Sequence, residues 1–174
     1  MAIFPILNGE NNITSFFGSR TAPTAGASTN HQGIDIAAPT GTAVLAAAPG
    51  RVLGVLRSNA KGNYIELEHS DGSITEYAHL SSAGVTPGQY VTAGQTIGQV
   101  GSTGIATGPH LHFGVKVGGS YVDPQSWLSS AAAQKGGTSF NLDNIGETIS
   151  GAVNDYWLWI IAALVVFAVL TKRR

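Results

Sequence analysis

Short runs of apolar and β-branched residues, broken by glycine, proline, asparagine or aspartate, make up residues 1–128. A period of two residues within short runs is typical of strands. The runs predict strands at 42–48, 51–56, 63–68, 73–79, 90–91, 96–100, 110–117 and 121–122. Because nothing in this part keeps a helical period, we predict an all-β domain at 1–128, with an antiparallel β-sheet or β-sandwich-like fold.

The pattern changes after residue 128. Residues 129–137 are rich in alanine, serine and glycine, which indicates a linker. Further along, apolar side chains recur at intervals of three and four residues, with polar side chains between them; they are Leu142, Ile145, Ile149 and Val153. This spacing predicts a short amphipathic helix within 129–155, which would pack on a membrane surface or on a neighbour.

The third part, 156–174, contains an unbroken apolar run at 157–170. As a helix, 156–171 covers about 24 Å, less than a hydrocarbon core about 30 Å thick. Local thinning, or a helix start near Gly151, would close this gap. The run is flanked by Tyr156, Trp157 and Trp159 at one end and by Lys172, Arg173 and Arg174 at the other. Aromatic and basic flanks favour one transmembrane helix over a buried core helix.

The two ends of the chain make conflicting predictions about topology. The basic C-terminus favours the cytoplasmic or genome-facing side, which would place the β-domain on the opposite side. However, residues 1–10 lack a basic region, and Pro5 interrupts their short apolar run, so no ordinary signal peptide is predicted. About 150 residues would then have to cross the membrane without one.

Composition narrows the function classes. The 23 glycines and the 11% share of charged residues favour a turn-rich β fold, and the 43% apolar share argues against disorder. A net charge of −1 gives no indication of a nucleic-acid partner. The chain has no cysteine, so disulfides and thiolate metal sites are excluded. Any metal must therefore be held by histidine, aspartate or glutamate.

Two short motifs could supply such ligands. In the predicted strand at 110–117, His110 and His112 should lie on one face, with Leu111 and Phe113 directed into the core. A His-x-His pair alone is more often two surface histidines than a metal site.

The second motif joins His31 to Asp35 through Gly33, which lets the chain bend so that both side chains could converge. Ile34 and Ile36 alternate with Asp35, as in a strand entering the core. Two imidazoles and one carboxylate are a three-ligand zinc set that leaves a fourth position for water.

Residues 13–128 resemble the M23 family of zinc peptidases, the lysostaphin-like and LytM-like peptidoglycan hydrolases. The resemblance is carried by blocks in family order: TSFFGSR at 14–20, HQGIDIAAPTGT at 31–42, YAHLS at 77–81, GQTIG at 94–98, GSTG at 101–104 and TGPHLHF at 107–113. The family implies one Zn²⁺ and a peptidoglycan substrate. Gly114 is a departure, because many relatives carry glutamate there.

By resemblance, His31, Asp35 and His112 are the zinc ligands, and His79 and His110 are catalytic. In the family's mechanism a zinc-bound water attacks the scissile carbonyl while these two histidines handle its proton or the oxyanion. The sequence does not divide the two roles. A Gly-Gly bridge and a D-Ala–diaminopimelate cross-link both remain open as the bond that is cut.

Two further features lie outside the ligand set. His69 matches none of the motifs and follows a strand beside a Ser-Asp-Gly turn, so we predict an exposed hairpin residue. The loop at 21–30 is either one wall of the substrate groove or an ordinary surface loop.

These observations support two functions. The first is a zinc endopeptidase acting on peptidoglycan and held by residues 156–174 in a lipid membrane, either the bacterial envelope or the virion membrane of a phage. The second is a non-enzymatic envelope or virion component that uses the same fold for binding or assembly. The oligomeric state is left open.

Overall fold

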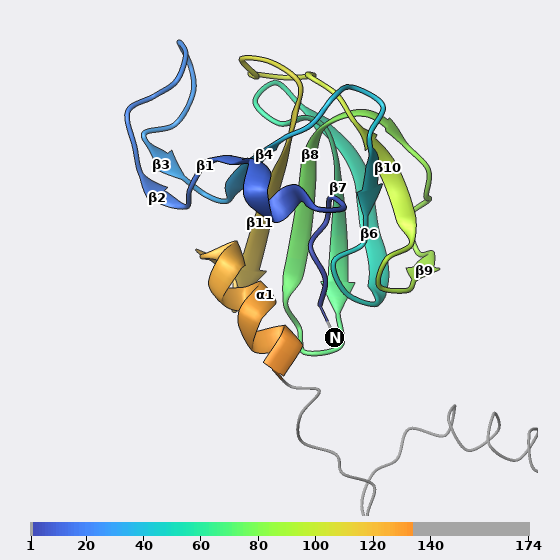
Figure 1. The fold of residues 1–174 in the computed structure, drawn as a ribbon. Coiled ribbons are helices and arrows are strands. Elements are labelled where there is room, and N and C mark those ends of the chain that lie inside the picture. Colours follow the sequence, from blue (N-terminus) through green and yellow to red (C-terminus); the bar gives the residue numbers. More distant parts are fainter. Residues whose placement is uncertain (1, 134–174) are drawn as a thin grey trace, which may run out of the picture. The chain divides into compact units, whose positions relative to one another are not determined.

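A computed structural model describes residues 2–133 of the chain (Figure 1). The elements are η1 (Gly9–Asn12), β1 (Ile13–Ser15), β2 (Gly18–Ser19), β3 (Asn30–His31), β4 (Ile34–Ala37), β5 (Ala43–Leu45), β6 (Gly50–Ser58), β7 (Gly62–His69), β8 (Ile74–Ala83), β9 (Tyr90–Val91), β10 (Thr96–Val100), β11 (His110–Val117), β12 (Ser120–Val122) and α1 (Pro124–Ala133). The periodic residues of the predicted amphipathic helix, Leu142 to Val153, and the predicted transmembrane helix at 156–174 lie outside the described residues. Within residues 2–133, no helix has the length and apolar character needed to cross a membrane.

One ten-stranded antiparallel sheet dominates the fold, which confirms the antiparallel β prediction. Its main path runs β1-β4-β11-β8-β7-β6-β9, while β10 joins β8 to β5 and β12 extends β11. Strands β2 and β3 form a separate pair. The strands thus form one branched sheet and a small ribbon. The hairpin of β7 and β8 turns at 70–72, and β9, β10 and β11 have their predicted bounds, whereas β5 is shorter than predicted.

Alternation along the central strands separates the core from the opposite face. Ile34 and Ile36 on β4, and Leu111 and Phe113 on β11, have no exposed surface, as their spacing predicted. The side chains between them on the same strands, Asp35 and His112, are only partly buried. The core packing therefore fixes which side chains the sheet presents on its other face.

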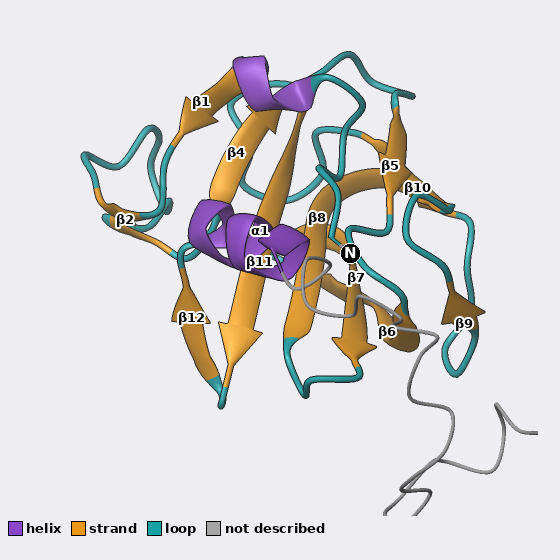
Figure 2. Ribbon diagram, turned by 60° about the horizontal axis from the view of Figure 1, so that its bottom comes forward, coloured by secondary structure: helices purple, strands orange, loops and turns teal. Residues whose placement is uncertain are grey.

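Helix α1 corrects the predicted end of the β-domain. It lies across β11 (Figure 2) and continues to Ala133, so the linker predicted from residue 129 is wrong for 129–133. The Asp123 carboxylate accepts hydrogen bonds from the Gln125 amide at 3.1 Å and the Ser126 hydroxyl at 2.8 Å, which caps the helix. Pro124 then occupies the first helical position, where its fixed φ is favourable. An Asp-Pro pair is a helix-start signal that hydrophobic periodicity does not show.

His69 is also corrected: it is 6% exposed rather than an exposed hairpin residue. It continues the inward alternation of Ile65 and Leu67 on β7, and this outweighs its position beside a turn. Its Nδ1 donates to the Pro49 carbonyl at 2.8 Å, so Nε2 accepts from the Thr75 hydroxyl at 2.8 Å. Burial lowers the pKa of His69. The residue is a hydrogen-bonded, neutral part of the core.

Candidate metal centre

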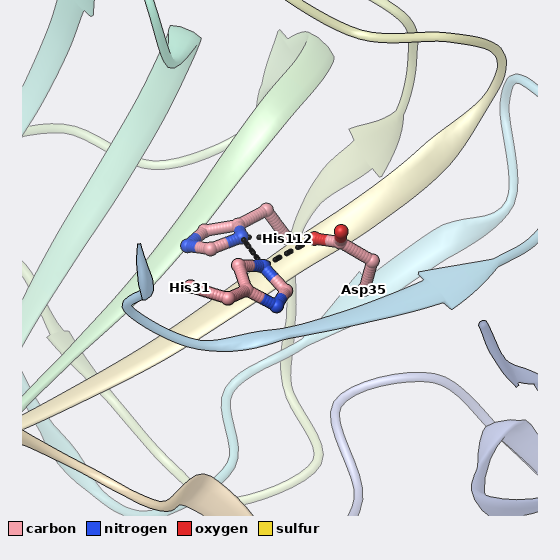
Figure 3. A group of neighbouring side chains, drawn as sticks. All are labelled: His31, Asp35 and His112. Atoms are coloured by element: carbon pink, nitrogen blue, oxygen red, sulfur yellow. Dashed lines mark hydrogen bonds and ion pairs between the residues drawn. The ribbon is translucent and has the colours of Figure 1, made fainter. Parts of the chain in front are cut away.

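The sheet register places two of the predicted ligands side by side. Asp35 on β4 and His112 on β11 are directly paired across antiparallel strands. His31 lies on β3, paired with Gly18 of β2, and the turn at 32–33 brings its ring back toward β4. Figure 3 shows the three side chains converging from these strands.

The donor atoms of this triad fit one metal ion. His31 Nε2 lies 3.0 Å from Asp35 Oδ1 and 3.0 Å from His112 Nδ1, and His112 Nδ1 lies 2.9 Å from Asp35 Oδ1. Two bonds of about 2.0–2.2 Å from a single Zn²⁺ can reach atoms up to about 4 Å apart. Two imidazole nitrogens and a carboxylate oxygen are also a donor set that zinc accepts in catalytic sites. The residues present could therefore hold the ion.

Neighbouring groups orient two of these ligands. His31 Nδ1 donates to the Phe16 carbonyl at 2.8 Å, so Nε2 of the neutral ring carries the lone pair that a metal needs. The Arg20 guanidinium donates to Asp35 Oδ2 at 2.8 Å and to the Ser15 hydroxyl at 2.5 Å. Arg20 and Ser15 belong to the block at 14–20, but the spacing of that block does not reveal this contact.

The carboxylate of Asp35 is held in its charged form. Burial alone would raise its pKa, but its contacts with the His112 and His31 rings outweigh burial and hold the pKa of Asp35 well below its usual range. A ligand that is already ionised releases no proton when a metal binds.

The two remaining histidines lie beside the triad. His79 Nδ1 donates to the Thr103 carbonyl at 2.7 Å, and His110 Nδ1 donates to the Gly108 carbonyl at 2.8 Å. Since a carbonyl only accepts, each neutral ring keeps an Nε2 lone pair. The two ring centres are 4.6 Å apart, and His110 Nε2 is 3.7 Å from Asp35 Oδ1. Burial, with the neighbouring His110 and His112 rings, lowers the pKa of His79 to about 4.

His79 reaches the site through a distortion of β8. Tyr77 pairs with Ile65 and Leu80 pairs with Asn63, so one residue of β7 faces two residues of β8. His79 at this bulge has a φ of 62°, in the left-handed region that non-glycine residues seldom adopt. With regular alternation His79 would share the core-facing side of Tyr77. The bulge turns it toward the triad, which the sequence pattern does not predict.

A groove crosses this site. A cavity of about 520 Å³ is bounded on one side by the loop at 21–27 and on the other by the segment at 105–109, which favours the loop as a groove wall over an ordinary surface loop. A second cavity of about 180 Å³ extends toward Lys61. Both are lined by the same five central residues, so we treat them as the first and second arms of one groove; they are Arg20, Ala27, His79, Ile105 and His112.

The structure thus brings together all five side chains selected from the sequence, and comparison with known proteins gives them a context. A family model described as peptidase family M23 matches residues 29–124. The DD-carboxypeptidase/endopeptidase Mpg of Neisseria meningitidis is 44% identical over 114 residues, which is 66% of this chain and 26% of Mpg. The peptidoglycan DD-endopeptidase ShyC of Vibrio cholerae is 40% identical over 113 residues, 65% of this chain and 26% of ShyC.

Among solved structures, a zinc-containing peptidase from Vibrio cholerae superposes with a TM-score of 0.64 at 39% identity, covering 71% of this chain and 39% of that one. The matched part of the chain spans about a quarter of the length of the two curated relatives. The match of the family model and the similarity to these proteins lead to one conclusion: the chain belongs to peptidase family M23.

Proposed function

We propose that the protein is a zinc-dependent endopeptidase that hydrolyses peptide bonds in the stem peptides or cross-bridges of bacterial peptidoglycan. The observation that carries this proposal is the triad of His31, Asp35 and His112, whose donor atoms lie within 3.0 Å of one another. Two further imidazoles stand beside it, each with Nδ1 bound to a carbonyl and Nε2 available. This arrangement suits hydrolysis of an amide assisted by a metal ion.

The site divides the chemistry between the ion and the protein. Bound Zn²⁺ would polarise the scissile carbonyl and lower the pKa of a water molecule to near 7. With its pKa of about 4, His79 is neutral at pH 7 and able to accept a proton at Nε2. His110 Nε2 lies 3.7 Å from Asp35 Oδ1 and, once it has taken up a proton, can donate that proton to the oxyanion or the leaving amine. Such acid-base assistance contributes about 10²–10⁴-fold to a rate.

The groove and the relatives support the choice of substrate. The walls of the first arm are mostly small and neutral; they include Thr21, Pro23, Thr24, Ala27, Ala106, Thr107 and Gly108. Such walls leave room for an extended peptide backbone. Both curated relatives are named as endopeptidases, and ShyC is named for peptidoglycan. Because the chain matches about a quarter of each, the substrate remains a proposal.

Purified cell walls provide the test of activity. We expect the zinc-loaded protein to clear walls, with the loss of turbidity abolished by a chelator and restored by Zn²⁺. The variant His110→Ala should retain zinc but lose about 10²-fold or more in rate. If the zinc-loaded protein clears walls of no type, the proposal is wrong. If His110→Ala keeps the full biological role, the non-enzymatic alternative is favoured.

We also propose that residues 156–174 anchor the protein in a membrane, either the bacterial envelope or the virion membrane of a phage. The support is the apolar run at 157–170 with its aromatic and basic flanks. The full chain should stay in the membrane pellet after an alkaline wash, whereas a chain ending at residue 155 should be released. Detection in purified virions would favour the phage membrane, and detection only in host envelopes would exclude it.

A further inference from the structure

The two arms of the groove differ in charge. Apart from histidines, the charged residues among the described lining of the first arm are Arg20 and Asp35, which form an ion pair at 2.8 Å. The described lining of the second arm contains no acidic side chain and adds one cation, Lys61. A ligand in the second arm therefore meets a positive charge that a ligand in the first arm does not.

The position of Lys61 is fixed by the network behind it. Its ammonium donates to Glu76 Oε2 and, at 3.2 Å, to the Tyr121 hydroxyl, and it lies 5.0 Å from the centre of the Tyr64 ring. Glu76 has no exposed surface, whereas the Lys61 side chain is 29% exposed. The lysine is thus held at the surface of the groove by an anion that the groove does not reach.

One donor of the Lys61 ammonium is left over. An ammonium has three N–H groups, and Glu76 and Tyr121 accept two of them. The third N–H group of the ammonium has no hydrogen-bond acceptor within residues 2–133. Burial would lower the pKa of Lys61, but the pairing with Glu76 outweighs it and raises the pKa, so the side chain stays charged at neutral pH.

The turn that carries Lys61 is also tied to the catalytic side of the groove. The Lys61 carbonyl accepts from the His79 amide at 2.9 Å, and the Ala60 carbonyl accepts from the Ile105 amide at 2.9 Å. Lys61, His79 and His112 all line the second arm. A group bound by the ammonium would therefore lie in the same arm of the groove as these two histidines.

We propose that Lys61 is a specificity-determining residue that binds a free carboxylate next to the scissile bond of the substrate. This inference rests on the proposed function and selects between the two bonds left open by the sequence. In a D-Ala–diaminopimelate cross-link, the carbon attached to the leaving nitrogen carries a carboxylate, whereas the interior of a polyglycine bridge carries none. The positive second arm therefore favours the direct cross-link.

Two soluble cross-linked peptides that differ in one group test this inference. Both contain the D-Ala–diaminopimelate bond, and the carboxyl group beside the leaving nitrogen is free in one and a carboxamide in the other. Since a hydrogen bond to a charged group is strong, we expect kcat/KM to favour the free carboxylate by about tenfold or more. In Lys61→Met the ratio of kcat/KM for the carboxylate peptide to that for the carboxamide peptide should fall to near one, because kcat/KM falls for the carboxylate peptide alone. Lys61→Arg should restore part of this ratio.

Lys116→Met is the matched control. Lys116 contacts the same network, 2.8 Å from Glu66 and 3.6 Å from Glu76, but lines neither arm of the groove. Its loss should leave the ratio unchanged. Because Lys61→Met removes the nearer of the two ammonium groups beside the buried Glu76, the double variant Lys61→Met/Glu76→Gln serves if the single variant does not fold.

The outcomes separate the two proposals. A wild-type protein that cleaves both peptides equally, or cleaves only a pentaglycine peptide, overturns the assignment of Lys61 while the endopeptidase function stands. A ratio unchanged in Lys61→Met, or an equal loss on both peptides, overturns it as well. A wild-type protein that cleaves no peptide and clears no cell wall overturns the proposed function and this inference with it.

Discussion

A single methyl group at Gly33 should disable the metal centre. A Cβ at this position would lie 2.4 Å from the Phe113 carbonyl oxygen, and 2.8 Å and 2.9 Å from His112 Cε1 and Nε2. Ordinary van der Waals contacts begin at 3.4 Å. In Gly33→Ala the new methyl group must therefore move about 1.0 Å further from the carbonyl oxygen and about 0.6 Å further from the His112 ring. The carbonyl belongs to a central strand and cannot turn aside. The turn that carries His31 must therefore move away from β11.

The size of the effect follows from this displacement. Metal sites need their ligands within about 0.5 Å of the productive geometry. Loss of support around the ligands typically lowers metal affinity about 10–100-fold, and a misplacement of about 1 Å can cost about 10²-fold in rate. Overpacking should also destabilise the fold by about 1–3 kcal/mol. We therefore expect Gly33→Ala to lose at least about tenfold in zinc affinity.

Competition with a chromophoric chelator measures that affinity, and thermal unfolding of the metal-free protein measures the stability. Gly84→Ala is the matched control, because its Cβ would meet nothing closer than the Ile97 carbonyl oxygen at 3.6 Å, and Gly84 has no left-handed φ. If Gly33→Ala binds zinc as tightly as Gly84→Ala, then close packing of the turn on His112 does not position the ligands, and our account of the site is wrong.

Three further predictions concern the stability of the domain. Tyr77→Phe leaves the buried Ala47 amide without its acceptor at 2.8 Å and should lower the free energy of unfolding in urea by about 1–3 kcal/mol. The control Tyr90→Phe, at an exposed position, should not change it measurably. Equal effects of the two variants would contradict this prediction. Burial lowers the pKa of His69, so its imidazole binds a proton more readily in the unfolded chain than in the folded one. The contribution of His69 to the unfolding free energy is therefore complete above a pH of about 6.5 and is lost as the pH falls below that value. His69→Gln should reduce the loss of unfolding free energy between pH 7.5 and 5.5, and an unchanged loss would refute this. Asp123→Ala removes the cap of α1 and should lower the unfolding free energy by about 1 kcal/mol in the same assay.

Strand alternation explains why much of the site was predictable. Once Leu111 and Phe113 are directed into the core, His110 and His112 must lie on the other face of the strand. In the same way, burial of Ile34 and Ile36 places Asp35 on the other face of its strand. These relations are local in the chain, so a sequence shows them directly. The antiparallel pairing of β4 with β11 then brings the two motifs together.

The remaining features depend on contacts that local patterns do not encode. The bulge that turns His79 toward the triad arises from the pairing of β8 with β7 and from a left-handed residue that is not glycine. The contact of Arg20 with Asp35 joins segments 15 residues apart through a loop without regular period. For His69, the neighbouring turn suggested exposure, although its alternation with Leu67 pointed inward.

The pairing of Asp35 with His112 has a consequence for folding as well as for catalysis. A metal held by this triad would join positions 31, 35 and 112, and so close a loop of about eighty residues in a chain that has no cysteine for a disulfide. Closing a loop of that length removes conformational entropy from the unfolded chain. The ion would then act as a reversible cross-link between two central strands, and the melting temperature of the domain would rise with the concentration of free zinc.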